Sequence, residues 1–408
     1  MEPGTERVIR LLAVVALSSL FVGIVLSAFP TQKGDDHRDF SQFYCAAQIV
    51  RQGLGSDLYN IRTQSEFQSK LASVHVFYNH PPFEVLLFLP LTFVSYRAAY
   101  ILWTLLGVGL LLCAAAMIES FTRITLIVWQ YSRVRVDFGL VFFLFLTFSP
   151  ATVCLLLGQD SMLMLLIYTG VFVLMSTGAE FRAGCLLALG LFKFQLIVPF
   201  ALVLLLRRKW SVAWGFAVIG SLLILLSIGM SGVKVLTAYP RFLLFESRYQ
   251  QIAGFAPEYM PNIRGALYLL FHRSLGSLGF NILVAGVSAL VLWVAAKNWR
   301  DEKLGLSFSA AIFATLLASY HLYNYDLTLL LLPVSIVCGK LTRRDGLISI
   351  LVTFSASLVV LFVPPVHRLL LLHGLYALMV FPIVGLFSAV LRLTRSSAAG
   401  GDAMECGV

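Results

Sequence analysis

Charge is scarce in this sequence. Only 12% of its 408 residues are Asp, Glu, Lys or Arg, about half of the share in a typical soluble protein. Hydrophobic residues make up 59% of the chain and recur in long runs, the first of which is 11–29. As a helix, such a run is roughly 28 Å long and matches the apolar core of a bilayer. The shortage of charge therefore argues against a soluble enzyme and indicates a polytopic membrane protein.

Several familiar signatures are also missing. The six cysteines include no closely spaced pair of the metal-binding type, and they do not favour a disulfide framework. No P-loop, GxGxxG, HExxH or GxSxG element stands in a supporting context, so nothing indicates ATP hydrolysis or dinucleotide chemistry. The formal net charge of +10 comes without a basic and aromatic groove, so we expect no nucleic-acid partner.

What the chain does have is a series of apolar blocks. We predict an all-α, polytopic integral membrane protein with about twelve transmembrane helices, forming a single membrane-embedded domain over 1–408. The blocks are 11–29, 83–94, 98–118, 138–157, 162–177, 183–206, 211–230, 281–296, 304–320, 327–338, 347–363 and 369–391. Blocks 83–94 and 327–338 are short for full crossings, so either one can instead be re-entrant.

The basic residues suggest an orientation. Many of them stand in short connections or in the tail, and such positions usually face the cytoplasm. Loops 30–81 and 231–265 then face the extracytoplasmic side. Two topologies remain open between them. If 183–206 crosses once, "GQD" (158–160) lies near the inner side and Arg123 outside; if "GQD" faces outward, a segment between 81 and 207 is re-entrant.

Acidic residues are concentrated in the first of these loops. Asp35, Asp36 and Asp39 occur in "KGDDHRDF", just before an amphipathic helix predicted at 40–53, whose apolar face includes Tyr44. Asp39 either caps this helix or acts as a general base at the membrane surface. Asp35 and Asp36 are either solvated or support that site.

Other polar residues stand in or beside apolar blocks, where such side chains often have a function. Lys193 either snorkels or faces a cavity or an anionic group such as a phosphate. Glu84 is either functional or reaches the interface. Arg264 is either solvated or binds a phosphate. The remaining candidates, each with an alternative role in capping, helix contacts or the interface, are His80, Gln159, Asn262, His321, Tyr325 and Asp326.

Six stretches, in this order, resemble the polyprenol-phosphate-mannose-dependent mannosyltransferases of the GT-C class, which include the phosphatidylinositol-mannoside mannosyltransferases. They extend over about residues 38–334. They are "RDFSQFYCAAQIVRQGLGSDLYN", "YNHPPFEVLLFLPLTFVSYRAAYILW", "LLLGQDSMLMLLI", "FKFQLIVPFALVLLLRRKW", "MPNIRG" and "YHLYNYDLTLLLLPV". The resemblance implies a GT-C-type glycosyltransferase fold in which the first extracytoplasmic loop carries the catalytic aspartate, here Asp39 with Asp36 as substitute.

The resemblance also implies a reaction. A sugar, with mannose favoured over arabinofuranose, moves from a polyprenol-phosphate donor to a hydroxyl of a glycolipid or glycan acceptor, with inversion. Asp39 takes the proton of the acceptor, and Lys193, Arg264 or His321 stabilises the phosphate that leaves. No metal or other cofactor is required. The family's patterns further place a tyrosine at Tyr44 and a late histidine–tyrosine–aspartate motif at His321, Tyr325 and Asp326.

Two other functions are compatible with the sequence. A transporter or flippase of lipid-linked sugars can use intramembrane charges such as Lys193 and Glu84, although the two related halves typical of transporters are missing. The second alternative function is that of a non-catalytic partner in envelope assembly. For the enzyme, we expect a multi-pass protein of the cytoplasmic membrane, in contact with membrane lipids, whose active site faces the extracytoplasmic side.

Overall fold

The computed structural model describes residues 14–15, 18–19, 22, 38–71, 76–126, 137–248, 256–340, 355–358 and 360–396. Within these ranges every regular element is a helix, as the sequence predicts. Most of the block 11–29 lies outside the described residues, as do Asp35 and Asp36. What the sequence predicts for them stays a prediction.

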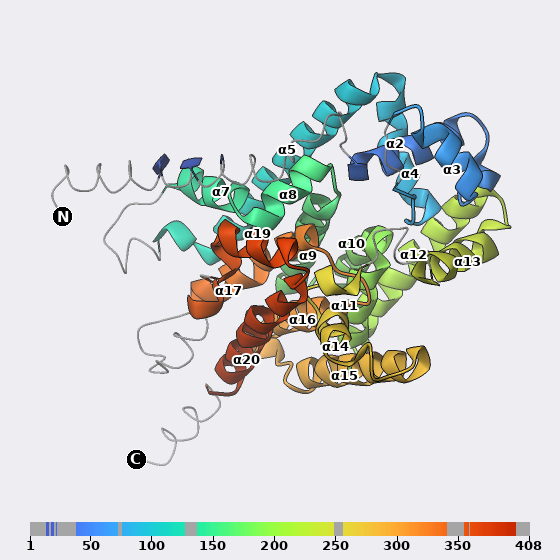
Figure 1. Cartoon of the computed structure of the whole chain (residues 1–408). Coiled ribbons are helices and arrows are strands. Elements are labelled where there is room, and N and C mark those ends of the chain that lie inside the picture. The colour runs from blue at the N-terminus through green and yellow to red at the C-terminus, as the bar shows by residue number, and fades with distance from the viewer. Residues whose placement is uncertain are drawn as a thin grey trace, which may run out of the picture.

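The elements comprise α-helices (α) and 3-10 helices (η), and Figure 1 shows their arrangement. In chain order they are α2 (Arg38–Arg51), η1 (Gly55–Asp57), α3 (Ile61–Gln68), η2 (Pro82–Glu84), α4 (Val85–Phe88), η3 (Leu89–Phe93), α5 (Tyr96–Thr122), α7 (Phe138–Leu146), α8 (Ser149–Leu157), α9 (Ser161–Ser176), α10 (Glu180–Leu189), η4 (Gly190–Lys193), α11 (Phe194–Leu206), α12 (Trp210–Ser231), α13 (Val235–Arg248), η5 (Pro257–Tyr259), α14 (Ile263–Phe271), α15 (Ser277–Lys297), η6 (Asp301–Lys303), α16 (Leu304–Ala318), η7 (Asn324–Leu330), α17 (Leu331–Lys340), α19 (Pro364–Leu372), η8 (Tyr376–Met379) and α20 (Val380–Ser396).

Several of these helices are long and apolar enough to cross a membrane. In the described part there are five, or up to seven if each of two bent pairs is one span. The five are α5, the run 180–206, α12, α15 and residues 376–395; the pairs are α7 with α8, bent by 65°, and 355–362 with 365–372, bent by 70°. The chain is thus a multi-pass membrane protein, while the count of about twelve spans stays a prediction.

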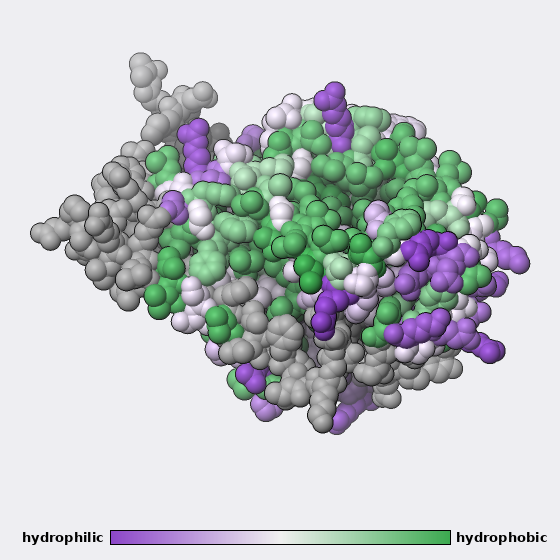
Figure 2. Space-filling model, turned by 90° about the horizontal axis from the view of Figure 1, so that it is seen from above, coloured by the Kyte–Doolittle hydropathy of each residue, from purple (hydrophilic) through white to green (hydrophobic). Residues whose placement is uncertain are grey.

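Helix α5 illustrates how these helices meet lipid. It begins after Ser95, whose hydroxyl accepts from Ala98 N, and it continues for 27 residues. Trp103 on one face is buried, whereas Leu105 on another face is 62% exposed. A helix that is apolar on all sides places such leucines in the bilayer rather than in water. Figure 2 shows the broad hydrophobic surface that results, with hydrophilic side chains gathered mainly toward one side.

Basic connections meet at one end of the bundle, which we call the basic end. Lys209, just before α12, pairs at 2.9 Å with Glu180 at the start of α10. It also pairs at 2.9 Å with Asp301 in η6. Lys303, just before α16, donates to Thr394 O near the end of α20 at 2.6 Å. The basic connections at Lys209 and Lys303 therefore lie on one side, as predicted. Arg97, which the sequence groups with them, lies instead in the first turn of α5, where the neighbouring Tyr96 packs on Tyr44 of α2.

The run 180–206 is apolar and long enough for one crossing, as predicted, but it is folded differently. Lys209, three residues beyond the run, pairs with Glu180 at its beginning, so both ends lie at the basic end. A straight helix of this length would separate its ends by about 40 Å. The chain instead turns at η4, and α10 and α11 form a re-entrant hairpin with Lys193 at its tip.

The segment 82–93 does not cross the bundle either. It begins beside His80, whose ring lies 5.1 Å from that of Phe43 in α2. It ends at Val94, whose carbonyl accepts a hydrogen bond from Tyr44, the next residue of α2, at 2.8 Å. Both ends of the segment thus contact neighbouring residues of one helix. The short block predicted at this place is re-entrant.

The re-entrant paths of 82–93 and 180–206 decide between the two topologies that the sequence leaves open for the region between loops 30–81 and 231–265. The "GQD" loop lies beside α2, because Gln159 is hydrogen-bonded to Asp39. Helix α5 starts next to α2 and runs away from it, so Arg123 at its end lies toward the basic end. There, Phe121 packs on Phe172 near the end of α9, at 4.8 Å between ring centres. The alternative with Arg123 on the side of the acidic loop is wrong.

Helix α2 is covered by protein. Its apolar residues Phe40, Phe43 and Ile49 are completely buried. The ring of Phe43 stacks on that of Phe88 in α4 at 4.5 Å. The amphipathic helix expected at the membrane surface is therefore present, but α3, α4 and η3 contact its apolar face. Its first turn is fixed firmly enough to hold a functional side chain.

Candidate active site

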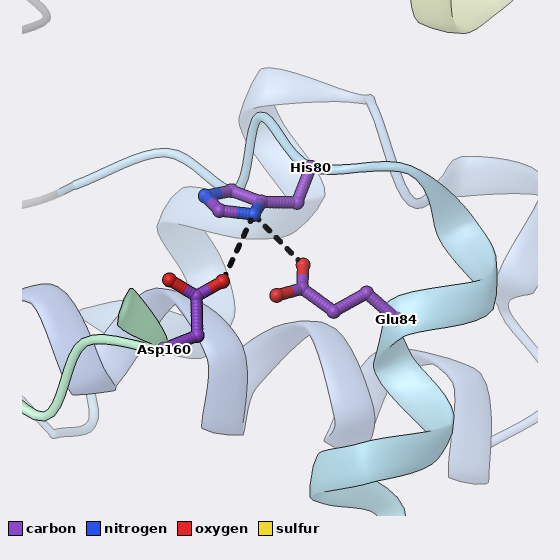
Figure 3. A group of neighbouring side chains, drawn as sticks. All are labelled: His80, Glu84 and Asp160. Atoms are coloured by element: carbon purple, nitrogen blue, oxygen red, sulfur yellow. Dashed lines mark ion pairs between the residues drawn. The ribbon is translucent and has the colours of Figure 1, made fainter. Parts of the chain in front are cut away.

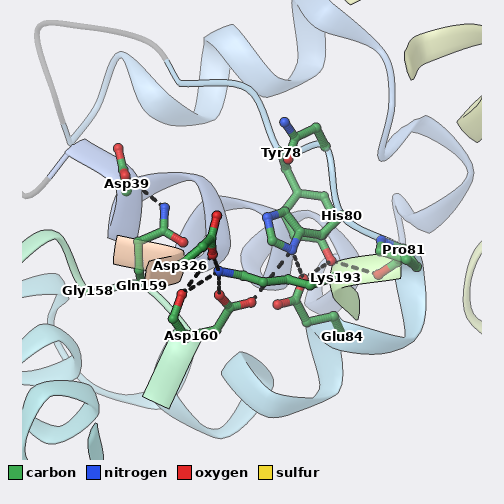
Figure 4. Close-up of polar contacts among 12 residues, drawn as sticks. Asp39, Tyr78, His80, Pro81, Glu84, Gly158, Gln159, Asp160, Lys193 and Asp326 are labelled. Carbon is green, nitrogen blue, oxygen red and sulfur yellow. Dashed lines mark hydrogen bonds and ion pairs between the residues drawn. The ribbon is translucent and has the colours of Figure 1, made fainter. Parts of the chain in front are cut away.

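Polar side chains from five distant segments meet near the beginning of α2. The segments are the first turn of α2, residues 78–84, the loop 158–161, the hairpin tip at η4, and η7. Figure 4 shows these side chains as one connected group. Most of the group is buried: Glu84 and Asp160 are each 1% exposed, and Lys193 is 2% exposed. Such a group inside an apolar bundle is costly unless its charges are paired.

The loop at the centre of this group depends on a glycine. Gly158 ends α8 with a left-handed backbone, at φ 68°. A Cβ at this position would also lie 2.7 Å from Cβ of Phe40. The indole of Trp103 donates to Gly158 O at 3.0 Å and fixes the turn. After this turn, Gln159 reaches α2 and Asp160 reaches the hairpin tip.

Asp39 lies in the first turn of α2, which begins at Arg38. It is therefore placed inside the helix rather than at the capping position. Gln159 Nε2 donates to Asp39 Oδ2 at 2.7 Å. The side chain of Asp39 remains partly exposed.

Lys193 is paired with carboxylates of the protein itself. Its Nζ lies 2.7 Å from Asp160 Oδ1 and 2.6 Å from Asp326 Oδ1. It also donates to Ser161 Oγ at 2.7 Å, and this hydroxyl donates to Asp326 at 2.9 Å. The ring of Tyr325 lies 4.9 Å from the ammonium group. The anionic group expected near Lys193 is therefore supplied by two aspartates.

His80, Glu84 and Asp160 form the other half of the group (Figure 3). His80 Nδ1 lies 2.9 Å from Glu84 Oε2 and 3.7 Å from Asp160 Oδ2. The hydroxyl of Tyr78 donates to Glu84 Oε2 at 3.2 Å and to Pro81 O at 2.8 Å. These three side chains are the ones in the described part of the chain whose ligand atoms lie close enough to hold a metal ion.

Two further candidates come from the start of α14. Asn262 caps this helix: its Oδ1 accepts from Gly265 N at 2.9 Å and its Nδ2 donates to Ser319 O at 2.8 Å. The guanidinium of Arg264 stacks on the ring of Tyr320 at 3.9 Å and donates to Tyr320 O at 3.1 Å. Asn262 thus has a clear structural role. Arg264 is buried, with an exposed fraction of 3%, and its Nε has no hydrogen-bond partner in the described part of the chain.

His321 is close enough to interact electrostatically with Arg264 and with two members of the buried group, His80 and Lys193. Its ring packs edge-on against Tyr323 at 4.6 Å. Burial lowers the pKa of His321 to about 3, and the positive charges of Arg264 and Lys193 add to the shift. The imidazole is therefore neutral near pH 7, so it can donate one hydrogen bond and accept another.

Most of the predicted residues meet here. Tyr44 does not: its hydroxyl is bonded to Val94 O and its ring packs on Tyr96, so it holds α2 in place. The predicted residues that the structure connects in one group are Asp39, His80, Gln159, Lys193, Tyr325 and Asp326.

Two members of the group were not predicted as site residues. The sequence analysis places Asp160 only in the "GQD" loop, although a carboxylate between two apolar blocks itself indicates a functional position. For Glu84, the sequence is compatible with a functional or an interfacial role, and its burial favours a functional one. Both became recognisable once the fold placed them beside Lys193 and His80.

Comparison with known proteins now identifies the family. Residues 78–320, more than half of the chain, match the model of glycosyltransferase family 87. The chain belongs to glycosyltransferase family 87. This is a GT-C-like family, so the predicted membrane glycosyltransferase is confirmed at that level. Neither the curated proteins nor the solved structures yield a match.

The family 87 match covers only part of the site. It includes the segments of Glu84, Asp160, Lys193 and Arg264. It begins after α2 and ends before η7, so neither Asp39 nor Asp326 is within it. What links Asp39 to the family 87 region is its contact with Gln159 in the tertiary structure.

Proposed function

We propose that this glycosyltransferase uses Asp39 as its general base. One observation carries the assignment: of the four carboxylates in the site, Asp39 alone is partly exposed. The exposed fractions of Glu84, Asp160 and Asp326 are 1%, 1% and 2%. A general base must lie within hydrogen-bond reach of the proton that it removes. An acceptor hydroxyl from outside the bundle meets that requirement at Asp39.

The donor is a sugar linked to a polyprenol phosphate, and Arg264 binds its phosphate. Two carboxylates already compensate the charge of Lys193. Arg264, in contrast, forms no ion pair with a carboxylate in the described part of the chain, and its Nε has no hydrogen-bond partner there. A guanidinium suits two phosphate oxygens at once. The neutral imidazole of His321 beside it supplies a further hydrogen bond.

The chemistry follows from these positions. Asp39 accepts the proton as the acceptor oxygen attacks the anomeric carbon. The bond between this carbon and the phosphate oxygen breaks on the opposite face, and the electron pair leaves with the polyprenyl phosphate. Arg264 and His321 stabilise the negative charge that grows on the phosphate. One base and a single displacement give inversion at the anomeric carbon.

The finer parts of the proposal concern substrates and membrane side. Mannose is the proposed sugar, and a glycolipid or glycan hydroxyl is the acceptor. The proposed fold is the GT-C type with about twelve spans. The active site faces the extracytoplasmic side, because it lies at the end of the bundle away from the basic connections that include Lys209 and Lys303.

The test is a donor screen with the purified full-length protein in lipid. Several polyprenol-phosphate sugars are supplied, and release of polyprenyl phosphate is followed. We expect release with one class of sugar, most strongly with mannose. Asp39→Asn keeps the shape of the side chain and removes the base, so transfer should fall by a factor of about 100 or more.

Asp57→Asn is the matched control. Asp57 is an exposed carboxylate in η1, and the same substitution there should leave transfer unchanged. Undiminished transfer by Asp39→Asn would remove Asp39 from the mechanism. If the protein moves lipid-linked sugars across the bilayer without releasing polyprenyl phosphate, the alternative function as a flippase is correct.

A further inference from the structure

His80, Glu84 and Asp160 point toward one another from two separate segments (Figure 3). Each offers one ligand atom, and these atoms all lie within 4.8 Å of one another. The distances from His80 Nδ1 to Glu84 Oε2 and to Asp160 Oδ2 are 2.9 and 3.7 Å. Ligand atoms that share an ion at about 2.1 Å lie roughly 3.0–3.5 Å apart. The observed distances bracket that range.

The buried group also has an unbalanced charge. Glu84, Asp160 and Asp326 are carboxylates with exposed fractions of 2% or less. The ammonium of Lys193 contacts Asp160 and Asp326 directly, whereas Glu84 lies against His80. Three carboxylates against one ammonium leave two negative charges uncompensated when His80 is neutral. Uncompensated charge in such a place is strongly destabilising. A divalent cation or two protons would remove this cost.

Several ligand atoms lack hydrogen-bond partners. Glu84 Oε1 and Asp160 Oδ2 are buried and have no hydrogen-bond donor in the described part of the chain. His80 Nδ1 lies close to two carboxylate oxygens, yet it forms no well-directed hydrogen bond with either. Proteins rarely leave buried carboxylate oxygens in this state. An ion between the three side chains would satisfy all of them.

We propose that His80, Glu84 and Asp160 bind a divalent transition-metal ion, Mn²⁺ or Zn²⁺, for which one imidazole and two carboxylates are suitable ligands. The other oxygen of Asp160 remains bound to Lys193. The ion connects the stretch 78–84 to the loop 158–161. Gln159 of this loop holds Asp39, so the metal positions the base without touching it.

The first test is the metal content and stability of the wild-type protein. The full chain is purified without chelator from medium containing Mn²⁺ and Zn²⁺, and its metals are measured by mass spectrometry. We expect about one equivalent of bound ion. EDTA should lower the melting temperature, and either Mn²⁺ or Zn²⁺ should restore it. Absence of bound metal, together with a melting temperature that neither EDTA nor these ions change, would overturn the proposal.

The second test uses Glu84→Gln. This variant removes one ligand charge and should weaken metal binding by more than about tenfold. In EDTA it should be more stable than the wild type, because it carries one fewer uncompensated charge; with Mn²⁺ or Zn²⁺ the order should reverse. Asp57→Asn should retain the metal. Unchanged metal content in Glu84→Gln would place the ion elsewhere and overturn the assignment.

Should Glu84→Gln fail to fold, the wild type still decides. Mn²⁺ bound to His80 should show nitrogen coupling in pulsed paramagnetic-resonance spectra, and a spectrum without such coupling would contradict the site. All these experiments measure metal content, thermal stability or spectra, and none of them measures sugar transfer. Their failure is therefore distinct from a failure of the proposed reaction.

Discussion

Replacing Lys193 by methionine tests the central feature of the site, the buried ammonium between two aspartates. Methionine keeps a long, unbranched side chain, so the main loss is the charge. Lys193 is 2% exposed, and the side chains of Asp160 and Asp326 are 0% and 2% exposed. Removing one partner of a buried ion pair costs about 3–5 kcal/mol, because the remaining charges are left without compensation. In a chain of this size, this corresponds to a fall in melting temperature of roughly 4–6 °C.

The chain offers a matched control for this prediction. Lys209 also contacts two carboxylates, those of Glu180 and Asp301, at 2.9 Å each. The difference is exposure: the side chains of Glu180 and Asp301 are 30% and 61% exposed. Water and salt screen such a pair, so Lys209→Met should cost about 1 kcal/mol or less. The difference in burial alone should therefore make the loss of stability larger for Lys193→Met than for Lys209→Met.

The assay can use the cysteines of the protein. Cys45 and Cys154 are free and buried, so a thiol-reactive dye reports their exposure as the protein unfolds on heating. The measurement is made in EDTA, so that a bound metal cannot compensate the lost charge. Equal shifts for Lys193→Met and Lys209→Met, or no shift for Lys193→Met, would refute the reasoning. A further Asp326→Asn substitution should recover part of the loss.

Three other predictions follow from single contacts. Gln159→Leu removes the donor that positions Asp39, so kcat should fall by about tenfold with little change in KM; an unchanged kcat would contradict the role of this bond. Gly184→Ala should lower the melting temperature, because a Cβ there would lie 2.0 Å from a carbonyl oxygen of α12, whereas Gly286→Ala, which meets nothing within 4 Å, should not. Asn262→Ala should cost about 1 kcal/mol through loss of the α14 cap, and Asn262→Ser, which keeps a neutral capping oxygen, should recover part of it in the same melting assay.

Much of the fold could be predicted because hydropathy is a local property. The apolar blocks and the shortage of charge indicate helices in a membrane whatever their arrangement. The path of each block is a different matter. Residues 82–93 and 180–206 are both apolar, yet the first lies along α2 and the second turns back at Lys193. Hydropathy does not encode where a chain turns inside an apolar medium.

The site was predicted in part for a similar reason. Lys193 was recognisable from the sequence because an unpaired ammonium inside a span is costly, so a partner had to exist. Which partner it has depends on contacts between segments far apart in the chain. Asp326 is 133 positions away from Lys193, and Gln159 is 120 positions away from Asp39.

By itself, the sequence determined that this chain is helical, lies in a membrane, and carries charges that require partners. Those conclusions rest on the free-energy cost of placing polar groups among apolar ones. This cost depends on the type of each residue, so it can be read without knowing the fold. Only the tertiary structure decided that Lys193 is neutralised by aspartates, that Asp160 and Glu84 belong to the site, and that Asp39 stays partly exposed beside it. Pairing, burial and access are properties of neighbours in space, and the fold alone sets them.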